Sequence, residues 1–210
     1  MAATEHRDAR RAQIVTGVRA VARAQGIGNV TVARAADAAG VSVGMVQHYY
    51  RTKEALLIDA FRAVHESVLE RVDHQIALSE RRGARIEQML VDGLAQLLPL
   101  SPTRRDEVYL THAFAGLSLE DATIRTHLVD ARDEILRRVS AALENGQLCG
   151  EVDADLDCAA AAFTVVALVD GLAAKLLPDA DATERSWAVD ALADAVARLC
   201  PGECHHGLDD

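Results

Sequence analysis

Apolar side chains recur at helical spacing along most of the chain. Between residues 7 and 25 they stand at positions 14, 15, 18, 21 and 22, the pattern of one face of an amphipathic helix. The same spacing, bounded by glycine, proline and capping residues, predicts further helices. The predicted helices are residues 7–25, 32–40, 43–50, 53–80, 84–98, 103–118, 121–145, 156–177 and 183–199. No stretch alternates as a half-buried strand does, so the pattern predicts an all-α fold of nine helices.

Residues that start or stop helices mark the ends of these segments. Thr31, Ser42 and Thr52 each precede a predicted helix, where a side-chain oxygen can accept a backbone N–H. Gly40 ends the second predicted helix and Gly146 follows the seventh, since glycine is favoured at and just past a helix end. We therefore expect short connections, with a loop from Gly146 to the start of the eighth helix.

The second and third predicted helices are short and are joined by the turn AAGVS, which contains Gly40. Such a pair forms a helix-turn-helix, whose second helix can enter the major groove of DNA. The outward positions of that helix are Val43, Gly44, Gln47 and His48. Gln47 can bond bidentately to an adenine edge, and His48 can donate to a base or a phosphate. Gly44 has no side chain, so we expect the helix to approach DNA closely there.

Charge along the chain supports a nucleic-acid partner for the front part. Residues 1–65 hold nine basic and five acidic residues, a net charge of +4, whereas residues 66–210 hold 13 and 27, a net charge of −14. A basic head on an acidic body suits a small DNA-binding region, with chance variation as the alternative. Tyr49 and the backbone N–H groups that open the fourth helix suit contacts to phosphate, and Lys53 adds a positive charge there.

Composition excludes several other classes of protein. Half of the residues are apolar but only 3% are aromatic, so the core is expected to consist of Ala, Leu and Val. No apolar run of about 18 residues lacks a charge, and the N-terminus has no apolar stretch, so we expect neither a membrane span nor a signal peptide. The four cysteines form no disulfide framework, which favours reduced thiols and a cytoplasmic location. The chain has no G-x-S-x-G, P-loop, H-E-x-x-H or dinucleotide-binding motif, so we expect no enzyme.

The segment TVARAADAAGVSVGMVQHYYRTKEALLIDAF resembles the DNA-binding region of TetR-family transcriptional regulators. The shared features are the Ala-Ala pair, A-G-V-S, a glycine two residues after the serine, an aromatic pair, and K-x-x-L at the start of a long helix. These features cover residues 10–61. The resemblance implies a nine-helix, two-domain fold, with a DNA-binding domain at residues 1–55 and a ligand-binding and dimerisation domain at 56–210.

The resemblance also implies roles for matching residues. Thr31 would cap the second helix and touch phosphate, Tyr49 would contact the DNA backbone, and Lys53 would bind phosphate. Tyr50 matches the family's usual phenylalanine and is expected in the core. Many members carry tyrosine where this chain has Gln47, so we do not expect its operator to match those of relatives.

The eighth predicted helix, LDCAAAAFTVVALVDGLAAKLL, is apolar on nearly every side, so we expect it to be buried on all sides. Together with the last helix it could form a four-helix dimer interface, or else it is the central helix of a monomer. The predicted interface residues are Ala160, Phe163, Ala167, Gly171, Ala188, Leu192, Ala195 and Leu199. The pattern EVDADLDCAAAAF followed by VDGLA also resembles the C-terminal part of BetI-like members.

A pocket for a small molecule is expected among the fourth to eighth helices. Polar or aromatic residues inside apolar stretches are the candidates, although such a residue is more often an ordinary core residue than a ligand contact. The predicted ligand-binding residues are Met89, Tyr109, His112, Phe114, His127, Phe163, Thr164 and Asp170.

The tail sequence CPGECHH contains metal-ligand types at Cys200, Cys204, His205 and His206. Adjacent histidines in a terminal tail lack the separated ligand pairs of structural zinc sites, so we expect no metal and no cofactor.

The sequence thus predicts a DNA-binding transcriptional regulator. It would be a homodimeric repressor, released from a palindromic operator by an unidentified small-molecule inducer. The alternative is a small-molecule-binding helical protein whose helix-turn-helix is only structural.

Overall fold

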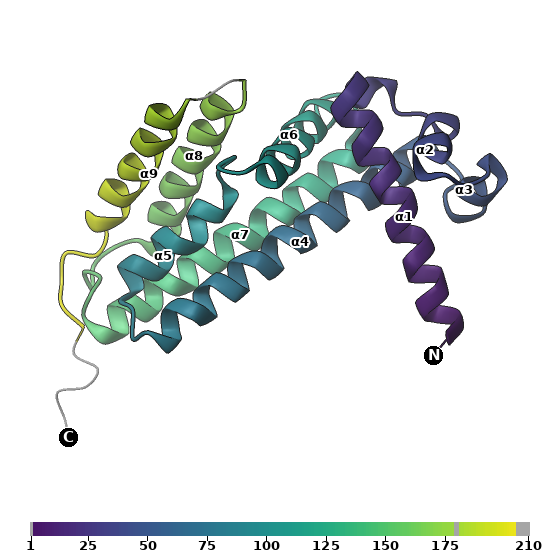
Figure 1. The fold of residues 1–210 in the computed structure, drawn as a ribbon. Coiled ribbons are helices and arrows are strands. Elements are labelled where there is room, and N and C mark those ends of the chain that lie inside the picture. Colours follow the sequence, from purple (N-terminus) through teal and green to yellow (C-terminus); the bar gives the residue numbers. More distant parts are fainter. Residues whose placement is uncertain (1, 179–180, 205–210) are drawn as a thin grey trace. The chain divides into compact units, whose positions relative to one another are not determined.

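The computed structural model describes residues 2–178 and 181–204, and these residues form α-helices and two short 3₁₀ helices without any strand. Figure 1 shows their order along the chain. The elements are α1 (Ala2–Gln25), η1 (Ile27–Asn29), α2 (Val32–Ala39), α3 (Val43–Tyr49), α4 (Lys53–Arg81), α5 (Ile86–Leu94), η2 (Ala95–Leu97), α6 (Pro102–Leu117), α7 (Ala122–Cys149), α8 (Cys158–Leu176) and α9 (Ala182–Ala197). The predicted all-α fold with nine α-helices is therefore confirmed for the described residues.

The sequence pattern predicted that α7 ends before Gly146. In the structure the helix continues to Cys149. A side chain at Gly146 would place its Cβ 2.4 Å from Cγ2 of Val152, so this glycine allows a close approach inside the helix. The turn that ends α7 comes at Gly150, which has a left-handed φ of 91°. The predicted fifth helix is also shorter than expected, because its last turn is the 3₁₀ helix η2.

The chain packs as two compact units. Unit 1 comprises the residues up to 67 together with 109–128, and unit 2 comprises 68–108 and the residues from 129 onward. Helices α4, α6 and α7 each contribute to both units. Unit 1 is thus larger than the predicted DNA-binding domain of residues 1–55.

The apolar face of α1 forms the core of unit 1, as its spacing predicted. Ile14, Val15, Val18, Val21 and Ala22 are all buried. Helix α2 crosses α1 closely, because a Cβ at Gly17 would lie 2.5 Å from the backbone oxygen of Ala35. Inside the same unit Phe61 and Phe114 stack with their ring centroids 4.1 Å apart.

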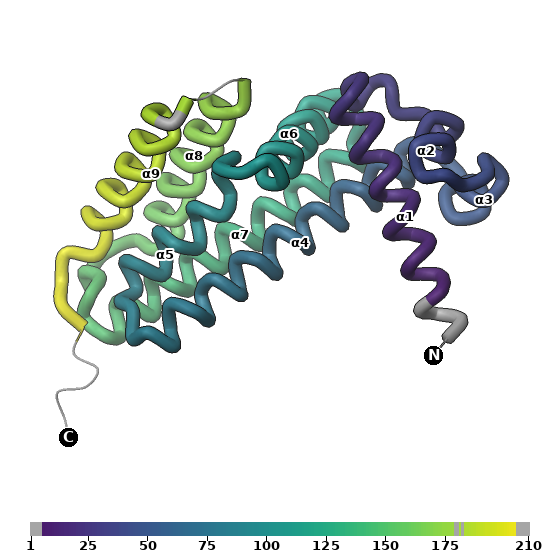
Figure 2. Tube along the Cα trace, viewed as in Figure 1, coloured from purple at the N-terminus to yellow at the C-terminus, as the bar shows by residue number. Residues whose placement is uncertain are grey.

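Unit 2 is built around α8. Helices α8 and α9 lie side by side, and α5 contacts α9 (Figure 2). The core contains small and branched side chains from these helices and from α7, including Leu90, Leu143, Val165, Val169 and Leu192. This composition agrees with the predicted core of Ala, Leu and Val.

Helix α8 is, by length and composition alone, apolar enough to cross a membrane. The sequence pattern predicted no membrane-spanning helix. Core helices of other folds pass the same test, and one face of α8 packs into the core of unit 2. The opposite face is exposed at Ala160, Phe163 and Ala167, so the expectation of burial on all sides is wrong for the single chain.

Candidate nucleic-acid interface and ligand pocket

The turn between α2 and α3 is closed by backbone and side-chain hydrogen bonds. Gly40 takes a left-handed conformation with φ of 64°, and the N–H of Val41 donates to the oxygen of Ala36 over 3.0 Å. The hydroxyl of Ser42 accepts the N–H of Met45 over 3.1 Å and caps α3. These contacts fix where α3 starts, as the sequence predicted.

Helix α3 has one buried and one exposed side. Val46 is fully buried, whereas Val43, Gly44, Gln47 and His48 are all exposed. These four positions stand at i, i+1, i+4 and i+5, so they form one continuous face. Nothing lies within 4 Å of a Cβ built at Gly44, which leaves this face open to a close partner. We call these four residues the α3 face.

Three residues outside the α3 face are the predicted contacts to phosphate. Thr31 is exposed and caps α2, since its hydroxyl accepts the N–H of Arg34 over 3.2 Å. Tyr49 is half-buried and packs edge-on against His48, with ring centroids 5.5 Å apart. The ammonium of Lys53 donates to the backbone oxygen of Gly28 over 2.9 Å, a contact that the sequence did not reveal. An ammonium has three donors, so Lys53 retains two for a phosphate.

Tyr50 is buried, as expected, but its hydroxyl belongs to a polar cluster that sequence reasoning missed. The hydroxyl donates to Asp59, and Arg11 donates to the same carboxylate. Burial, followed by the hydrogen bond to Asp59, raises the pKa of Tyr50 above its ordinary range. The hydrogen bond to Asp59 likewise raises the pKa of Arg11. This cluster joins α1 to α4 at Tyr50, the residue that follows α3.

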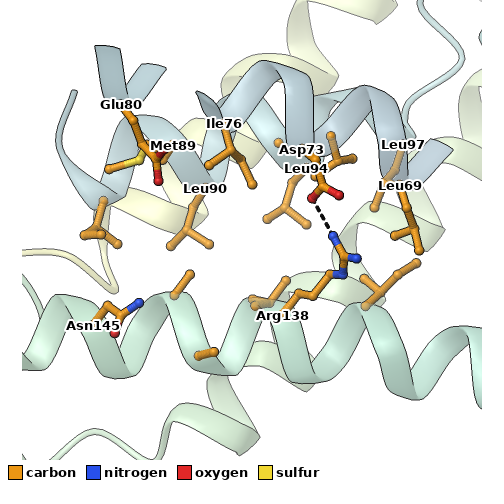
Figure 3. A pocket seen from close by; sticks show the side chains of 17 residues that line it. Leu69, Asp73, Ile76, Glu80, Met89, Leu90, Leu94, Leu97, Arg138 and Asn145 are labelled. Carbon is orange, nitrogen blue, oxygen red and sulfur yellow. Dashed lines mark hydrogen bonds and ion pairs between the residues drawn. The ribbon is translucent and has the colours of Figure 1, made fainter. Parts of the chain in front are cut away.

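Unit 2 contains a pocket of about 370 Å³ between α4, α5 and α7 (Figure 3). Its wall is mostly aliphatic, and none of the 17 lining residues is aromatic. The lining residues are Leu69, Val72, Asp73, Ile76, Glu80, Ile86, Met89, Leu90, Gly93, Leu94, Leu97, Ile135, Arg138, Val139, Ala141, Ala142 and Asn145. Three of them, Leu69, Val72 and Ile76, lie on α4, whose earlier residues Leu56 and Phe61 are buried in unit 1.

The mostly aliphatic lining contains one ion pair, between Asp73 and Arg138. Nη1 of Arg138 lies 2.5 Å from Oδ1 of Asp73, as the dashed line in Figure 3 shows. Arg138 also binds Glu134 over 2.7 Å on its own helix. The hydrogen bond from Arg138 lowers the pKa of Glu134, and the same bond raises the pKa of Arg138. Arg138 is therefore bound by two carboxylates, while Glu80 adds a further carboxylate to the lining.

The structure separates the eight predicted ligand-binding residues. Only Met89 lines this pocket. Tyr109, His112, Phe114 and His127 belong to unit 1, where Phe114 is fully buried in the core. Nε2 of His112 is buried without a hydrogen-bond partner, which is uncommon for a polar atom. Phe163, Thr164 and Asp170 are exposed on α8.

The predicted dimer residues also fall into two groups. Ala160, Phe163, Ala167 and Gly171 are exposed along one side of α8, and the side chain of Phe163 is 65% exposed. By contrast, Ala188 and Leu192 lie in the core of the chain itself, so we leave them out of any partner surface. The helical period turns these two residues of α9 inward toward α8.

Two further residues of the prediction, Ala195 and Leu199, are half-buried. Sequence reasoning missed Trp187, which is also 65% exposed and stands one position from buried Ala188. An exposed tryptophan next to a helix core position could have been found from the periodicity of α9.

Two family models match separate parts of the chain. Residues 14–60 match a family model described as "Bacterial regulatory proteins, tetR family". Residues 86–201 match one described as "BetI-type transcriptional repressor, C-terminal". The second match extends over more than half of the chain.

Individual proteins show the same similarity. The chain is 27% identical to the HTH-type transcriptional regulator TtgR of Pseudomonas putida, over 80% of this chain and 81% of that protein. It is 26% identical to the HTH-type transcriptional regulator PksA of Bacillus subtilis, over 81% and 80%. Among solved structures, a transcriptional regulator from Rhodococcus sp. Rha1 superposes with a TM-score of 0.78 at 24% identity, covering 90% of this chain and 95% of that one. A regulator from Saccharomonospora viridis in complex with choline gives 0.77 at 23% identity, over 92% and 97%.

Proposed function

Because the chain belongs to the TetR family of bacterial transcriptional regulators, we propose that it represses transcription as a homodimer bound to a palindromic operator. Residues 1–55 would form the DNA-binding domain, and residues 56–210 would bind a small molecule and the partner subunit. Regulators of this family bind DNA and act as dimers, and the cytoplasm is where such a protein meets its operator. We assign the chain no catalytic activity.

The observation that carries the proposal is the α3 face. Val43, Gly44, Gln47 and His48 are exposed together on a short helix whose other side is anchored by buried Val46. Gln47 can read an adenine edge, and the bare backbone at Gly44 lets the helix lie deep in the major groove. In a dimer the two α3 helices would contact half-sites about 34 Å apart, which is one turn of B-DNA.

We propose that the pocket of unit 2 binds the inducer. Its aliphatic wall favours a ligand with an aliphatic body, and the Asp73–Arg138 pair, Glu80 and Asn145 offer polar contacts. A quaternary ammonium is commonly held against aromatic faces, and this lining has none. The choline bound by the Saccharomonospora viridis protein is therefore not the ligand that we propose for this pocket.

Release from DNA would be a shift between two states of the dimer. A ligand changes such an equilibrium only by its difference in affinity for the two states. The inducer would therefore bind more tightly to dimers whose α3 helices no longer match successive grooves.

Binding to the DNA that flanks the chain's own gene tests the proposal. An electrophoretic mobility shift at several salt concentrations should reveal a specific site with two inverted half-sites, and the affinity should fall steeply as salt rises. Finding no salt-sensitive specific site would contradict the repressor function and favour a helix-turn-helix that is only structural.

Two variants distinguish contacts to the bases from contacts to the phosphates. Gln47→Ala should relax the preference at one base pair of each half-site, at a cost of about 1–3 kcal/mol. Lys53→Ala should weaken binding to all sequences alike and lower the salt dependence. If neither variant changes binding, α3 does not lie in the groove as proposed.

A further inference from the structure

Three side chains that can bind a metal ion meet in unit 2 outside the pocket. Sγ of Cys149, a carboxylate oxygen of Glu151 and Sγ of Cys204 all lie within 4.8 Å of one another. Cys149 is the last residue of α7, Glu151 lies in the connection to α8, and Cys204 lies in the segment after α9. Two distant parts of the chain thus bring their donor atoms together.

The segment that carries Cys204 is held firmly against the end of α7. The N–H of Gly202 donates to the backbone oxygen of Glu151 over 3.0 Å, and Arg85 donates to the oxygen of Gly202 over 2.5 Å. A Cβ at Gly202 would lie 2.0 Å from the oxygen of Gly150, so only glycine permits this contact. These contacts place Cys204 beside Cys149 without help from a metal.

The carboxylate of Glu151 is oriented by the start of α5. It is almost fully buried, and its two oxygens accept the N–H groups of Ile86 over 3.2 Å and of Glu87 over 3.4 Å. Oε2 also lies 3.4 Å from Nε of Arg85, and Oε1 lies 3.9 Å from Sγ of Cys149. A carboxylate has about four lone-pair sites, so Oε1 can still bind a metal beside Cys149.

We propose that Cys149, Glu151 and Cys204 form a binding site for one thiophilic divalent ion such as Zn²⁺. Two thiolates and a carboxylate are typical zinc ligands, and a water would complete four-coordination. A tetrahedral ion with metal–sulfur bonds of about 2.3 Å holds its sulfurs roughly 3.8 Å apart, so the donors need to move only slightly. Binding releases the two thiol protons, and the charge of the ion balances the three anionic donors together with Arg85.

This site is independent of the proposed DNA and inducer binding. It also differs from the tail motif considered in the sequence, because it uses Cys204 but takes its other ligands from Cys149 and Glu151. His205 and His206 lie outside the described residues. The ion would fasten the segment after α9 to α7 and α5.

Titration of the reduced, metal-free full chain with Co²⁺ tests the proposal. Co²⁺ commonly substitutes for Zn²⁺, and tetrahedral thiolate ligation produces sulfur-to-cobalt charge-transfer absorption. We expect saturation at one ion per chain, displacement by Zn²⁺, and a higher melting temperature in the presence of Zn²⁺. Cys149→Ser and Cys204→Ser should each weaken binding by more than about a hundredfold, because losing even an outer-shell contact costs about 10–100-fold.

Two further variants act as controls. Cys158 is another buried thiol, on α8, and lies outside the cluster, so Cys158→Ser should bind Co²⁺ like the unmodified chain. Circular dichroism of each variant shows whether it remains folded; Cys204 is only half-buried, so Cys204→Ser is expected to fold. A chain in which both His205 and His206 are replaced by alanine should retain binding.

Three results would overturn the proposal. One is unchanged binding after Cys149→Ser. Another is loss of binding only when the two histidines are replaced, which would place the ligands in the tail. The third is a reduced protein that binds no Co²⁺ and instead forms a Cys149–Cys204 disulfide on exposure to peroxide.

Discussion

At the scale of single residues, replacing a glycine of unit 1 by alanine should destabilise the fold at Gly17 but not at Gly44. Gly17→Ala would drive its Cβ to 2.5 Å from the backbone oxygen of Ala35, which cannot move without separating α1 from α2. We expect a loss of about 1–3 kcal/mol in the free energy of unfolding, as for other overpacked cores. Urea unfolding followed by circular dichroism measures it, and a Gly17→Ala chain as stable as the unmodified one would contradict the close helix contact.

Gly44→Ala is the matched control, because nothing lies within 4 Å of the added Cβ. Its stability should stay equal or rise by up to about 1 kcal/mol, since alanine is the better helix former. Its affinity for DNA should nevertheless fall if the α3 face lies in the groove. Unchanged affinity would show that α3 does not approach the bases at this position.

Tyr50→Phe should lower stability at neutral pH by about 1–2 kcal/mol, because the hydrogen bond to the Asp59 carboxylate is lost. The raised pKa of Tyr50 means that the folded chain favours the neutral phenol. Its contribution is therefore fully present below the ordinary pKa of 10.0 and is lost as the pH rises above that value. Urea unfolding of both chains at pH 7 and near pH 11 should show the difference between them shrink; a constant difference would contradict this role.

The sequence predicted the helix caps but not the hydrogen-bonded cluster around Tyr50, and the difference has a physical reason. A cap depends on a residue and its near neighbours, so Thr31 and Ser42 could be identified as caps from the sequence. The partner of Tyr50, by contrast, is Asp59 in the second turn of α4, and Arg11 reaches it from α1. Only the packing of the helices brings these groups together.

At the scale of helices, α4 and α6 are joined by an ion pair inside unit 2. The guanidinium of Arg71 lies 2.6 Å from Oε2 of Glu107, whose side chain is 2% exposed. Arg104 is also close, since burial and then the charge of Arg71 lower its pKa. Glu107→Gln would leave the two arginines without their carboxylate, so we expect a loss of about 2–3 kcal/mol in the free energy of unfolding.

The exposed Arg137–Glu134 pair is the control for this prediction. Its atoms are equally close, at 2.6 Å, but the side chain of Arg137 is 66% exposed. Arg137→Gln should therefore change stability by less than about 0.5 kcal/mol in urea unfolding. Equal losses in Arg137→Gln and Glu107→Gln would mean that burial does not determine the strength of these pairs.

Helix types could be predicted from periodicity, whereas the end of α7 could not. Glycine is favoured both at helix ends and where another segment comes close, and the sequence alone does not distinguish these uses. At Gly146 the second use applies, because Val152 folds back onto the helix. A signal that depends on a later segment cannot be interpreted before that segment is placed.

At the scale of the whole molecule, the basic front and acidic remainder of the sequence suggested a DNA-binding protein, and the chain does belong to a family of transcriptional regulators. The pocket could not be predicted, because its lining is drawn from residues 69–145 on α4, α5, η2 and α7 and consists mostly of ordinary aliphatic side chains. The candidates chosen for their chemistry, such as Phe114 and His127, lie in the other unit. Aliphatic pocket walls and aliphatic cores have the same sequence pattern.

The exposed side chains of α8 and α9 indicate that the chain self-associates. Phe163 on α8 and Trp187 on α9 are each 65% exposed, beside the small residues Ala160, Ala167 and Gly171. Small residues allow the helices of two subunits to approach closely, and large aromatics supply most of the binding energy in interfaces. We expect the chain to be a dimer by light scattering, with the emission of its single tryptophan shifting to longer wavelength on dilution.

Phe163→Glu should convert this dimer to a folded monomer. In a two-fold interface each substitution acts twice, so a cost of at least about 2 kcal/mol per copy raises the dissociation constant roughly a thousandfold. Leu119→Glu is the control, because Leu119 is 79% exposed but follows α6 in unit 1. If Leu119→Glu dissociates the dimer and Phe163→Glu does not, the subunits meet through unit 1, and the exposed side of α8 must have another partner.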